Sequence, residues 1–403
     1  MENENTAERK SMRVLMISSD RGMFDDAKSI RGRMIEYGSL VEELHIIVFA
    51  EKHLNLQDTQ IGPNVWAYPT NSSSRWAYIR DAKNLAEWLR QDKNFTPNLV
   101  TCQDPFETGW VGYKIHKKYG ACLQIQIHTD FLSKEFQKKS LLNKVRVIMA
   151  KRALSATNCI RVVSKRVQDS LLARKWNITR NVVLLPMFVD KERFVDTGQI
   201  DSTALELRKQ YKQFGFIILV AARFTTEKNI PLALRVVKII AKEYDGVGLL
   251  LVGDGPEKER LKRLVSAYGL EKNVVFVPWT ENIVSYYKAA NAFLLTSAFE
   301  GYSMVFVEAA LASCPVVATN VGIADMYVED GVNGFICPVN DARCLAKKLG
   351  RLISERNLGR AIAIRARDRM AESLSDKEQY LKLYKESWEG CCEVGKTKDV
   401  WEM

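Results

Sequence analysis

The chain has 403 residues, of which 47% are hydrophobic and 27% are charged. Single hydrophobic cores stop growing at roughly 250–300 residues, so this length favours two domains. The composition is that of a globular protein, and no apolar run approaches the roughly 20 residues that span a bilayer. The first ten residues are polar and show no secretory-signal pattern. The eight cysteines lack metal-ligand spacing, and we interpret them as reduced thiols of a cytoplasmic protein.

The net charge of +11 is concentrated in one segment. Residues 134–175 contain twelve Lys and Arg against two acidic residues, Glu135 and Asp169. One interpretation is a pair of helices with solvated basic faces, because blocks of like charge are often only surface. The other is attraction to an anionic membrane, at about 1 kcal/mol per basic residue near the surface. Both interpretations stay open, and of the anionic partners we expect a membrane rather than nucleic acid.

Apolar runs alternate with helical patterns along the chain, which is typical of parallel βαβ units. The first series of expected strands covers residues 13–17, 43–49, 98–101, 122–127, 159–163 and 182–185. A hinge is expected at residues 186–190, where a proline ends the last run. The second series covers residues 216–220, 248–252, 274–277, 292–295 and 315–317. The sequence therefore predicts an α/β fold with two Rossmann-like, doubly wound domains.

Two glutamates eight positions apart, Glu300 and Glu308, are the strongest indication of a site. The sequence predicts a polar loop over 297–301 and a helix over 303–312, so that one acid lies in the loop and the other in the helix. The first N–H groups of a helix favour anions, phosphate especially. Compensation of the helix dipole explains Glu300 well but Glu308 poorly, because an acid in an apolar run needs a partner if it is buried.

Five segments of the second domain, in this order, resemble the signature of retaining glycosyltransferases of the GT4 family. They are Ala-Arg-Phe-Thr-Thr-Glu-Lys-Asn at 222–229, Val-Gly-Asp-Gly-Pro at 252–256, the Glu-x7-Glu spacing at 300–308, Pro-Val-Val-Ala-Thr-Asn-Val-Gly at 315–322 and Asp-Gly-Val-Asn-Gly-Phe at 330–335. The resemblance implies a GT-B fold whose domains face an interdomain cleft. It also implies that the last helix, a capped amphipathic pattern over 375–388, crosses back onto the first domain. We place the domains at 1–190, 191–372 and 373–403, the last with a frayed tail.

The resemblance assigns roles to residues that follow the expected strands of the second domain. Arg223 and Lys228 would stabilise the leaving diphosphate, Glu300 would bind hydroxyls of the transferred sugar, and Glu308 would bind the donor ribose. The catalytic set implied in this way is His128, Glu300, Arg223 and Lys228. Further donor contacts are expected from Gly22, Gly253, Asp254, Gly255, Gly301, Ser303 and Met304. Gly-Asp-Gly-Pro also makes an ordinary turn into a helix. Its position after an expected strand is therefore the only reason to expect that this segment contacts the donor.

The first domain offers less certain candidates. His128 ends an expected strand, where similar enzymes place a histidine near the reacting sugar, although a histidine at a strand end is also an ordinary structural residue. Many relatives carry Gly-Gly after the first strand, whereas Gly22 stands here within Ser18-Ser-Asp-Arg-Gly-Met. The acceptor, which the first domain would set, is therefore the least determined part of the prediction.

The resemblance implies a retaining glycosyltransferase that moves a sugar from a UDP- or GDP-sugar to a hydroxyl acceptor, in envelope polysaccharide or glycolipid synthesis. The chain has no Asp-x-Asp pair for a divalent ion, so we expect no metal and no other cofactor. We expect a lipid-linked or saccharide acceptor and a cytoplasmic location at the inner face of the membrane, through residues 134–175. The alternatives are another nucleotide-sugar enzyme, such as an epimerase, and a non-catalytic basic module that binds membrane or nucleic acid.

Overall fold

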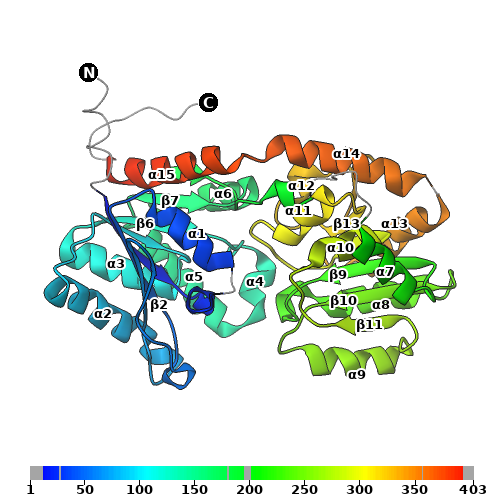
Figure 1. The fold of residues 1–403 in the computed structure, drawn as a ribbon, viewed down its shortest axis with the longest axis horizontal. Coiled ribbons are helices and arrows are strands. Elements are labelled where there is room, and N and C mark those ends of the chain that lie inside the picture. Colours follow the sequence, from blue (N-terminus) through cyan, green and yellow to red (C-terminus); the bar gives the residue numbers. More distant parts are fainter. Residues whose placement is uncertain (1–11, 27–28, 179–180, 195–200, 356, 394–403) are drawn as a thin grey trace. The chain divides into compact units, whose positions relative to one another are not determined.

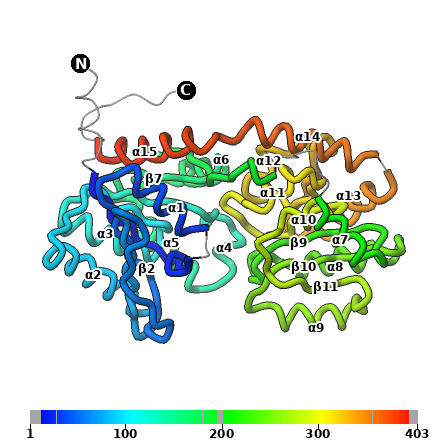
Figure 2. Tube along the Cα trace, viewed as in Figure 1, coloured from blue at the N-terminus to red at the C-terminus, as the bar shows by residue number. Residues whose placement is uncertain are grey.

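The computed structural model of the chain describes residues 12–26, 29–178, 181–194, 201–355 and 357–393. It divides into two compact units: unit 1 comprises Met1–Pro186 and Lys377–Met403, and unit 2 comprises Met187–Asp376. The units therefore end at Pro186 and Asp376, whereas the sequence suggests boundaries at 190 and 372. The polar residues that begin the chain and the expected frayed tail lie outside the described residues. Each unit has a sheet with helices on both faces (Figure 1; Figure 2).

Unit 1 is built on an eight-stranded sheet with the order β3-β4-β2-β1-β5-β6-β7-β8. The strands are β1 (Arg13–Ser18), β2 (Glu43–Val48), β3 (Thr59–Gly62), β4 (Val65–Pro69), β5 (Leu99–Cys102), β6 (Cys122–Ile127), β7 (Cys159–Val162) and β8 (Val182–Leu184). Neighbours pair in parallel, apart from the antiparallel β3 and β4 at one edge. The helices are α1 (Ser29–Gly38), α2 (Tyr78–Asp92), α3 (Glu107–Tyr119), α4 (Lys134–Lys139), α5 (Leu141–Leu154), α6 (Lys165–Leu172) and α15 (Lys377–Glu393).

Unit 2 is built on a six-stranded parallel sheet with the order β11-β10-β9-β12-β13-β14. The strands are β9 (Phe216–Ala221), β10 (Val247–Val252), β11 (Val274–Val277), β12 (Ala292–Leu295), β13 (Val316–Thr319) and β14 (Phe335–Cys337). The helices are α7 (Ser202–Gln210), α8 (Ile230–Ile240), α9 (Lys258–Tyr268), α10 (Ile283–Ala289), α11 (Met304–Leu311), α12 (Ala324–Tyr327), α13 (Ala342–Ser354) and α14 (Leu358–Ser373). Helices α8, α9 and α13 pack together, as do α10, α11 and α14.

The expected strands all appear, because most of them are runs of apolar residues that are buried in the sheet, as in β1, β9 and β12. Strands β6, β11 and β12 have the predicted bounds, and the others differ by one or two residues at an end. Three short strands, β3, β4 and β14, are absent from the sequence prediction. They have three to five residues each, and β3 and β4 meet at the sheet edge, where a strand need not be apolar on both faces.

Helix α15 packs within unit 1, beside β6 (Figure 1). Its aromatic side chains form the contact: Tyr384 stacks on Tyr37 of α1 with ring centroids 4.1 Å apart, and Trp388 is fully buried. The Tyr384 hydroxyl also accepts a hydrogen bond from the Gln126 side-chain amide of β6 at 3.1 Å. Large buried aromatic surfaces of this kind dominate the energy of such a contact.

A buried arginine connects β7 to α15. Arg161 is 1% exposed, and its guanidinium donates to the Gln126 side-chain oxygen at 2.8 Å and to the Tyr380 hydroxyl at 3.0 Å. It also donates to the carbonyls of Leu185 and Pro186, at 3.3 and 3.0 Å. Arg161 belongs to the basic segment 134–175, so this part of the segment is interior and not a charged surface.

The cysteines differ from the expected set of reduced thiols. The structure pairs Cys159 with Cys391 and Cys337 with Cys344 as disulfides. The first joins β7 to α15, across 232 positions of sequence, and the second joins β14 to α13. The sequence gives no distance in space between two cysteines, so neither the separation of 232 positions nor the separation of seven identifies a pair.

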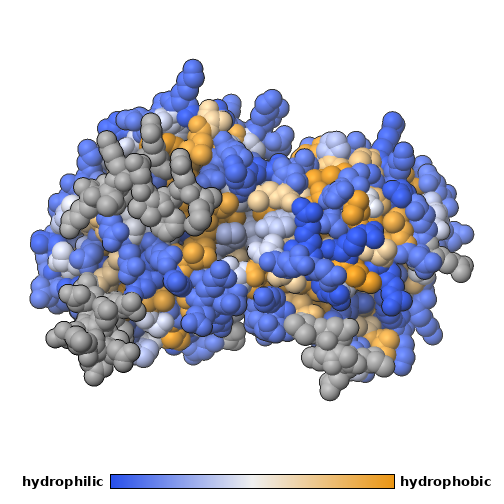
Figure 3. All heavy atoms as spheres, turned by 90° about the horizontal axis from the view of Figure 1, so that it is seen from above, coloured by the Kyte–Doolittle hydropathy of each residue, from blue (hydrophilic) through white to orange (hydrophobic). Residues whose placement is uncertain are grey.

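On the face shown in Figure 3, hydrophilic residues predominate and apolar residues form smaller patches between them. Among the described residues, no helix combines the length and the apolar character that crossing a bilayer requires.

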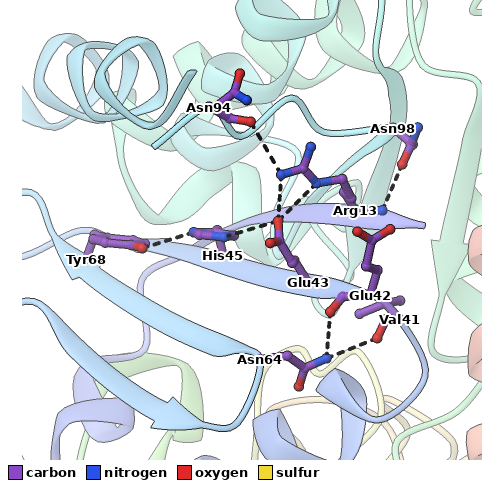
Figure 4. A network of polar contacts seen from close by, with 9 residues as sticks. All are labelled: Arg13, Val41, Glu42, Glu43, His45, Asn64, Tyr68, Asn94 and Asn98. Atoms are coloured by element: carbon purple, nitrogen blue, oxygen red, sulfur yellow. Dashed lines mark hydrogen bonds and ion pairs between the residues drawn. The ribbon is translucent and has the colours of Figure 1, made fainter. Parts of the chain in front are cut away.

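A polar network spans three neighbouring strands of unit 1 (Figure 4). Arg13 on β1 forms an ion pair with Glu43 on β2, with Nη2 and Oε2 2.8 Å apart. His45 on β2 lies 3.0 Å from the Tyr68 hydroxyl on β4 and packs against Phe95. Burial lowers the pKa of His45 to about 4, despite the nearby Glu43 carboxylate, so this imidazole is neutral at pH 7.

The low histidine pKa values predict acid sensitivity of unit 1. His128 also has its pKa lowered, to about 3, chiefly by burial and then by Arg161 and Arg33. Below pH 6.5 these two histidines become protonated in the unfolded chain but stay neutral in the folded chain. Their contribution to the unfolding free energy is therefore fully present above pH 6.5 and decreases as the pH falls toward 4. Each histidine should cost about 2 kcal/mol of unfolding free energy between pH 7 and pH 5.

Urea unfolding at both pH values checks this prediction, with His128→Gln as the comparison. The variant should lose about half of the pH-dependent destabilisation that the two histidines cause. Groups that titrate in the opposite sense, such as Asp104, whose pKa burial raises to about 6, are present in both proteins and cancel in the difference. Equal pH dependence in the two proteins would show that His128 is protonated normally in the fold.

Candidate active site

The carboxyl ends of the strands in unit 2 bring the predicted residues of that unit to one edge of its sheet. Strands β10, β9, β12 and β13 are neighbours and run parallel, so the loops that follow them leave the same edge. Arg223 and Lys228 come after β9, Gly253 after β10, and Glu300 after β12. Open α/β sheets bind ligands at such an edge.

An ion pair joins two of these loops. The Lys228 ammonium donates to Glu300 Oε1 at 2.6 Å, and the side chains are 23% and 12% exposed. Ser297 donates its hydroxyl to the same carboxylate oxygen at 2.7 Å. The sequence predicted both charged residues as ligand contacts but not that they meet. Their pairing fixes the position of an ammonium group at the sheet edge before any ligand arrives.

Backbone contacts hold the two loops together beneath this pair. The Ala298 N–H donates to the Glu227 carbonyl at 2.8 Å, and the Thr296 hydroxyl donates to the Lys228 carbonyl at 2.9 Å. The Thr319 hydroxyl, at the end of β13, donates to the Ser297 carbonyl at 2.8 Å. The loops after β9 and β12 are therefore held by hydrogen bonds that do not involve the charged ends of Lys228 and Glu300.

Arg223 presents its side chain to solvent. It is 75% exposed, and its nearest acidic contact is Glu227, with Nη2 and Oε1 3.9 Å apart. A planar guanidinium held so loosely can turn to bind a phosphate group through two hydrogen bonds.

The start of α11 contains a strained and incompletely bonded serine. Ser303, the residue before α11, has φ 84° and ψ 77°, in the left-handed region that serine avoids. It is 7% exposed, and its buried hydroxyl has no hydrogen-bond partner among the residues that the structure describes. Strain and an unpaired buried hydroxyl each reduce stability, and together they indicate a ligand at this point. The N–H groups of the first turn, including that of Met304, also lack partners inside the helix.

Neighbouring backbone is packed tightly around this helix start. Gly322, after β13, has φ 58°, and a Cβ atom built on it would lie 2.6 Å from the Tyr302 carbonyl oxygen and 3.1 Å from Glu300 Cβ. Only glycine allows this approach. Gly301 is buried in the same turn. The loop from Glu300 to Ser303 is thus held in one conformation.

Glu308 has the partner that an acid in an apolar run requires. Its Oε2 accepts a hydrogen bond from the Tyr287 hydroxyl of α10 at 3.0 Å. Burial raises the pKa of Glu308, while the Tyr287 hydroxyl and the positive charge of Arg193 lower it. Glu308 lies one helical turn after Met304 on the same face of α11. Tyr287 was not predicted from the sequence, because nothing in its own segment marks it as polar or functional.

Gly253 and Gly255 have a packing role in the structure. Their φ values are 140° and 156°, and Cβ atoms built on them would lie 2.0 Å from the Ala222 oxygen and 2.6 Å from the Phe224 oxygen. They allow the loops after β9 and β10 to touch. Asp254 points elsewhere, to an ion pair with Lys258 at 2.7 Å. These residues shape the loop that carries Arg223, and their predicted donor contacts stay predictions.

The two candidates of unit 1 already have partners. The Gly22 N–H donates to the Asp20 carboxylate at 3.0 Å, within a short 3-10 turn. His128 Nε2 lies 3.1 Å from Gln126 Oε1, an oxygen that Arg161 also contacts. Because arginine can only donate, that atom is an acceptor, and His128 must carry its proton on Nε2. His128 is thus a neutral imidazole whose Nδ1 can accept a hydrogen bond.

Two substitutions of Ser303 should separate ligand binding from stability. Ser303→Gly removes the left-handed strain and should raise the unfolding free energy by ~0.5–1 kcal/mol, while Ser303→Ala should be close to neutral. If the hydroxyl binds the ligand, both should weaken nucleotide binding about fivefold to tenfold in calorimetric titration.

Ser313 supplies the matched control at the other end of the same helix. It also has a left-handed φ, 56°. Ser313→Gly should stabilise the protein to a similar extent and leave nucleotide affinity unchanged. Ser303 variants with unaltered affinity would make Ser303 a structural residue only.

Comparison with known proteins identifies unit 2. Residues 206–369 match the family model of glycosyl transferases group 1. These residues belong to the glycosyl transferases group 1 family. The match contains every predicted site residue of unit 2, from Arg223 to Glu308, and it agrees with the resemblance seen in the sequence.

Curated relatives of this group 1 glycosyltransferase region are similar over part of their length. An uncharacterized glycosyltransferase of Haemophilus influenzae is 29% identical over 51% of this chain and 55% of its own length. The alpha-monoglucosyldiacylglycerol synthase of Acholeplasma laidlawii is 22% identical, over 68% and 71%. The N-acetyl-alpha-D-glucosaminyl L-malate synthase of Bacillus anthracis is 28% identical, over 44% and 48%. The chain thus spans about half the length of two of these three relatives.

Solved structures confirm the GT-B fold across both units. Anabaena HepE in complex with UDP-glucose superposes with a TM-score of 0.73 at 20% identity, covering 93% of this chain and 99% of that chain. Sucrose-phosphate synthase of Thermosynechococcus elongatus gives a TM-score of 0.77 at 20% identity, covering 93% and 98%. At this identity the likeness establishes the fold of the chain and nothing finer.

Proposed function

We propose that this protein is a retaining, metal-independent glycosyltransferase that moves a sugar from a nucleoside diphosphate sugar to a hydroxyl acceptor. The observation that carries the proposal is the strained Ser303 with its unpaired buried hydroxyl, at the start of α11 and three residues from the Lys228–Glu300 pair. A helix start beside the fixed ammonium group of Lys228 suits a diphosphate, which gains negative charge as the glycosidic bond breaks.

The proposed roles follow from the chemistry of each side chain. Lys228 and Arg223 stabilise the departing diphosphate electrostatically, in place of a divalent ion. Glu300 accepts hydrogen bonds from the transferred sugar, and Glu308 accepts them from the ribose while Tyr287 keeps its carboxylate oriented. Departure of the diphosphate on the face where the acceptor attacks leaves a phosphate oxygen to take the acceptor proton, which retains the configuration of the sugar.

UDP is the first nucleotide to test and GDP the second. HepE has been solved with UDP and with UDP-glucose, and these complexes motivate the order. For the acceptor we propose a lipid-linked or saccharide hydroxyl, at the cytoplasmic face of a membrane. The names of two relatives, alpha-monoglucosyldiacylglycerol synthase and capsular polysaccharide biosynthesis glycosyltransferase CapM, motivate this choice. Gly22 and the neutral His128 of unit 1 are proposed as polar contacts for sugar hydroxyls.

Thermal unfolding with UDP, GDP and ADP tests the proposal directly. A nucleotide at 100 times its Kd should stabilise unit 2 by about 2.7 kcal/mol. Glu308→Ala should lower the affinity for the stabilising nucleotide about tenfold to a hundredfold, because a hydrogen bond to a charged group is lost. Tyr287→Phe is the matched control, since it keeps the carboxylate and removes only its orienting hydroxyl, and its effect should be smaller.

The outcomes separate the possible functions. No stabilisation by any nucleotide would refute a donor site in unit 2. Stabilisation together with a changed sugar and no transfer product, with or without a membrane extract as acceptor, would identify an epimerase instead. Loss of the fold in Glu308→Ala without loss of affinity would make Glu308 structural.

A further inference from the structure

The outward face of α5 in unit 1 is apolar. Leu141, Val145 and Ile148 follow the i, i+4, i+7 spacing of one helix face and are 78%, 51% and 69% exposed. Leu142, beside them, is 44% exposed. The opposite face also carries buried side chains, among them Ala150 and Leu154. A helix at the surface of a soluble protein normally turns a polar face outward, so this helix needs a second partner.

Exposed lysines lie along one flank of this apolar face. Lys144 and Lys151, seven positions apart on one flank of the helix, are exposed, as is Lys138 at the end of α4, which packs against α5. No acidic residue occurs between Glu135 and Asp169. By contrast, Arg146 is engaged with Glu107 at 2.9 Å. The basic segment is therefore not uniform: Lys144 and Lys151 lie beside the exposed leucine, valine and isoleucine side chains of α5, whereas Arg146 is paired and Arg161 is buried.

We propose that the outward face of α5, formed by Leu141, Leu142, Val145 and Ile148 with Lys138, Lys144 and Lys151, inserts into the surface of an anionic lipid bilayer. Aliphatic side chains flanked by lysines are the pattern of a helix lying in the membrane interface. A protein partner fits less well, because the centres of protein interfaces are depleted in lysine and enriched in aromatic residues. Nucleic acid would meet the lysines but leave the apolar side chains in water.

This inference goes beyond the proposed transfer reaction, because the face belongs to unit 1 and none of its residues is a predicted donor contact. Membrane binding would then have two components, an electrostatic one and an apolar one, each due to different side chains. Lysines attract the protein to anionic headgroups over a screened distance, whereas the apolar side chains bind only by entering the bilayer. Insertion therefore predicts a part of the binding that survives high salt.

Flotation of the full-length protein with lipid vesicles tests the proposal. The probes are vesicles of phosphatidylcholine alone and of phosphatidylcholine mixed with phosphatidylglycerol. Wild-type protein should bind the anionic vesicles and keep part of that binding in high salt. Leu141→Ser with Ile148→Ser should lower the partition coefficient about tenfold or more and abolish the salt-resistant part. Lys144→Glu with Lys151→Glu should lower binding to anionic vesicles by at least about tenfold.

Leu205→Ser is the matched control, since Leu205 is 46% exposed on α7 of unit 2. It should bind vesicles as wild type does. All variants should keep their stabilisation by nucleotide, which shows that they are folded and separates this test from that of the transfer reaction. Binding that is insensitive to the leucine and isoleucine changes, or fully removed by salt, overturns insertion. If the serine variants instead convert a wild-type dimer to a monomer in sedimentation, the face is an interface between two copies and the proposal fails.

Discussion

Lys228→Ala should lower kcat/KM for sugar transfer about 10²–10³-fold, the usual effect of removing one fixed charge that stabilises a developing anion. The structure adds a second reason. Glu300 is only 12% exposed, and without Lys228 its carboxylate would stand unpaired beside the departing diphosphate. Lys228→Arg should recover part of the rate, because it restores the charge but not the geometry of an ammonium group. The measurement is the rate of nucleoside diphosphate release from the preferred donor.

Lys262→Ala provides the control for this substitution. Lys262 forms an exposed ion pair with Glu259 on α9, so its removal changes the net charge equally and leaves the sheet edge untouched. Its rate should equal that of wild type, since exposed ion pairs contribute little. A Lys228→Ala enzyme as fast as the Lys262→Ala enzyme would exclude a catalytic role for Lys228.

The second large effect is on stability. Arg161→Met should lower the unfolding free energy of unit 1 by about 3–5 kcal/mol, because it removes a buried donor that serves the Gln126 and Tyr380 side chains and the carbonyls of Leu185 and Pro186. Methionine is similar in length, so loss of packing is a minor part of this change. The amides of β6, β7 and α15 should exchange with solvent faster in hydrogen-exchange mass spectrometry, while those of β9 in unit 2 should serve as an unchanged internal reference.

Arg90→Met is the matched arginine control. Arg90 is 44% exposed and lies 3.6 Å from Glu87. Its replacement should change stability by less than about 0.5 kcal/mol. Equal, small effects of the two substitutions would mean that water can take the place of the Arg161 guanidinium in the buried network.

Much of unit 2 could be predicted from the sequence, because its information is local. Each of its five expected strands is an apolar run, and the residues that follow adjacent parallel strands must meet at one edge. Lys228 and Glu300 could therefore be assigned to one site although 72 positions separate them. The start of α11 was also predictable within one residue, since the apolar helical run begins there.

The remaining features depend on packing between distant segments. Tyr287 becomes the partner of Glu308 only because α10 and α11 pack together. The left-handed conformation of Ser303 is imposed by its neighbours, against the preference of serine. Arg161 lies in the basic segment 134–175, which was expected at the surface because of its charge. Only the position of β7 inside the sheet shows that this arginine is buried. Local pattern describes a segment's own tendency, whereas these residues are determined by what surrounds them.

The assignment of α15 to unit 1 has a consequence for synthesis of the chain. The residues that complete unit 1 begin at Lys377, after the whole of unit 2 has been made. At about 5–20 residues per second, the nascent strands β6 and β7 wait roughly 10–50 s on the ribosome for Tyr384 and Trp388. Unit 2, which is one continuous segment, can fold during this delay. Translation therefore exposes an incomplete apolar sheet face of unit 1, and we expect chaperones to bind nascent chains that end before α15 more strongly than chains that include it.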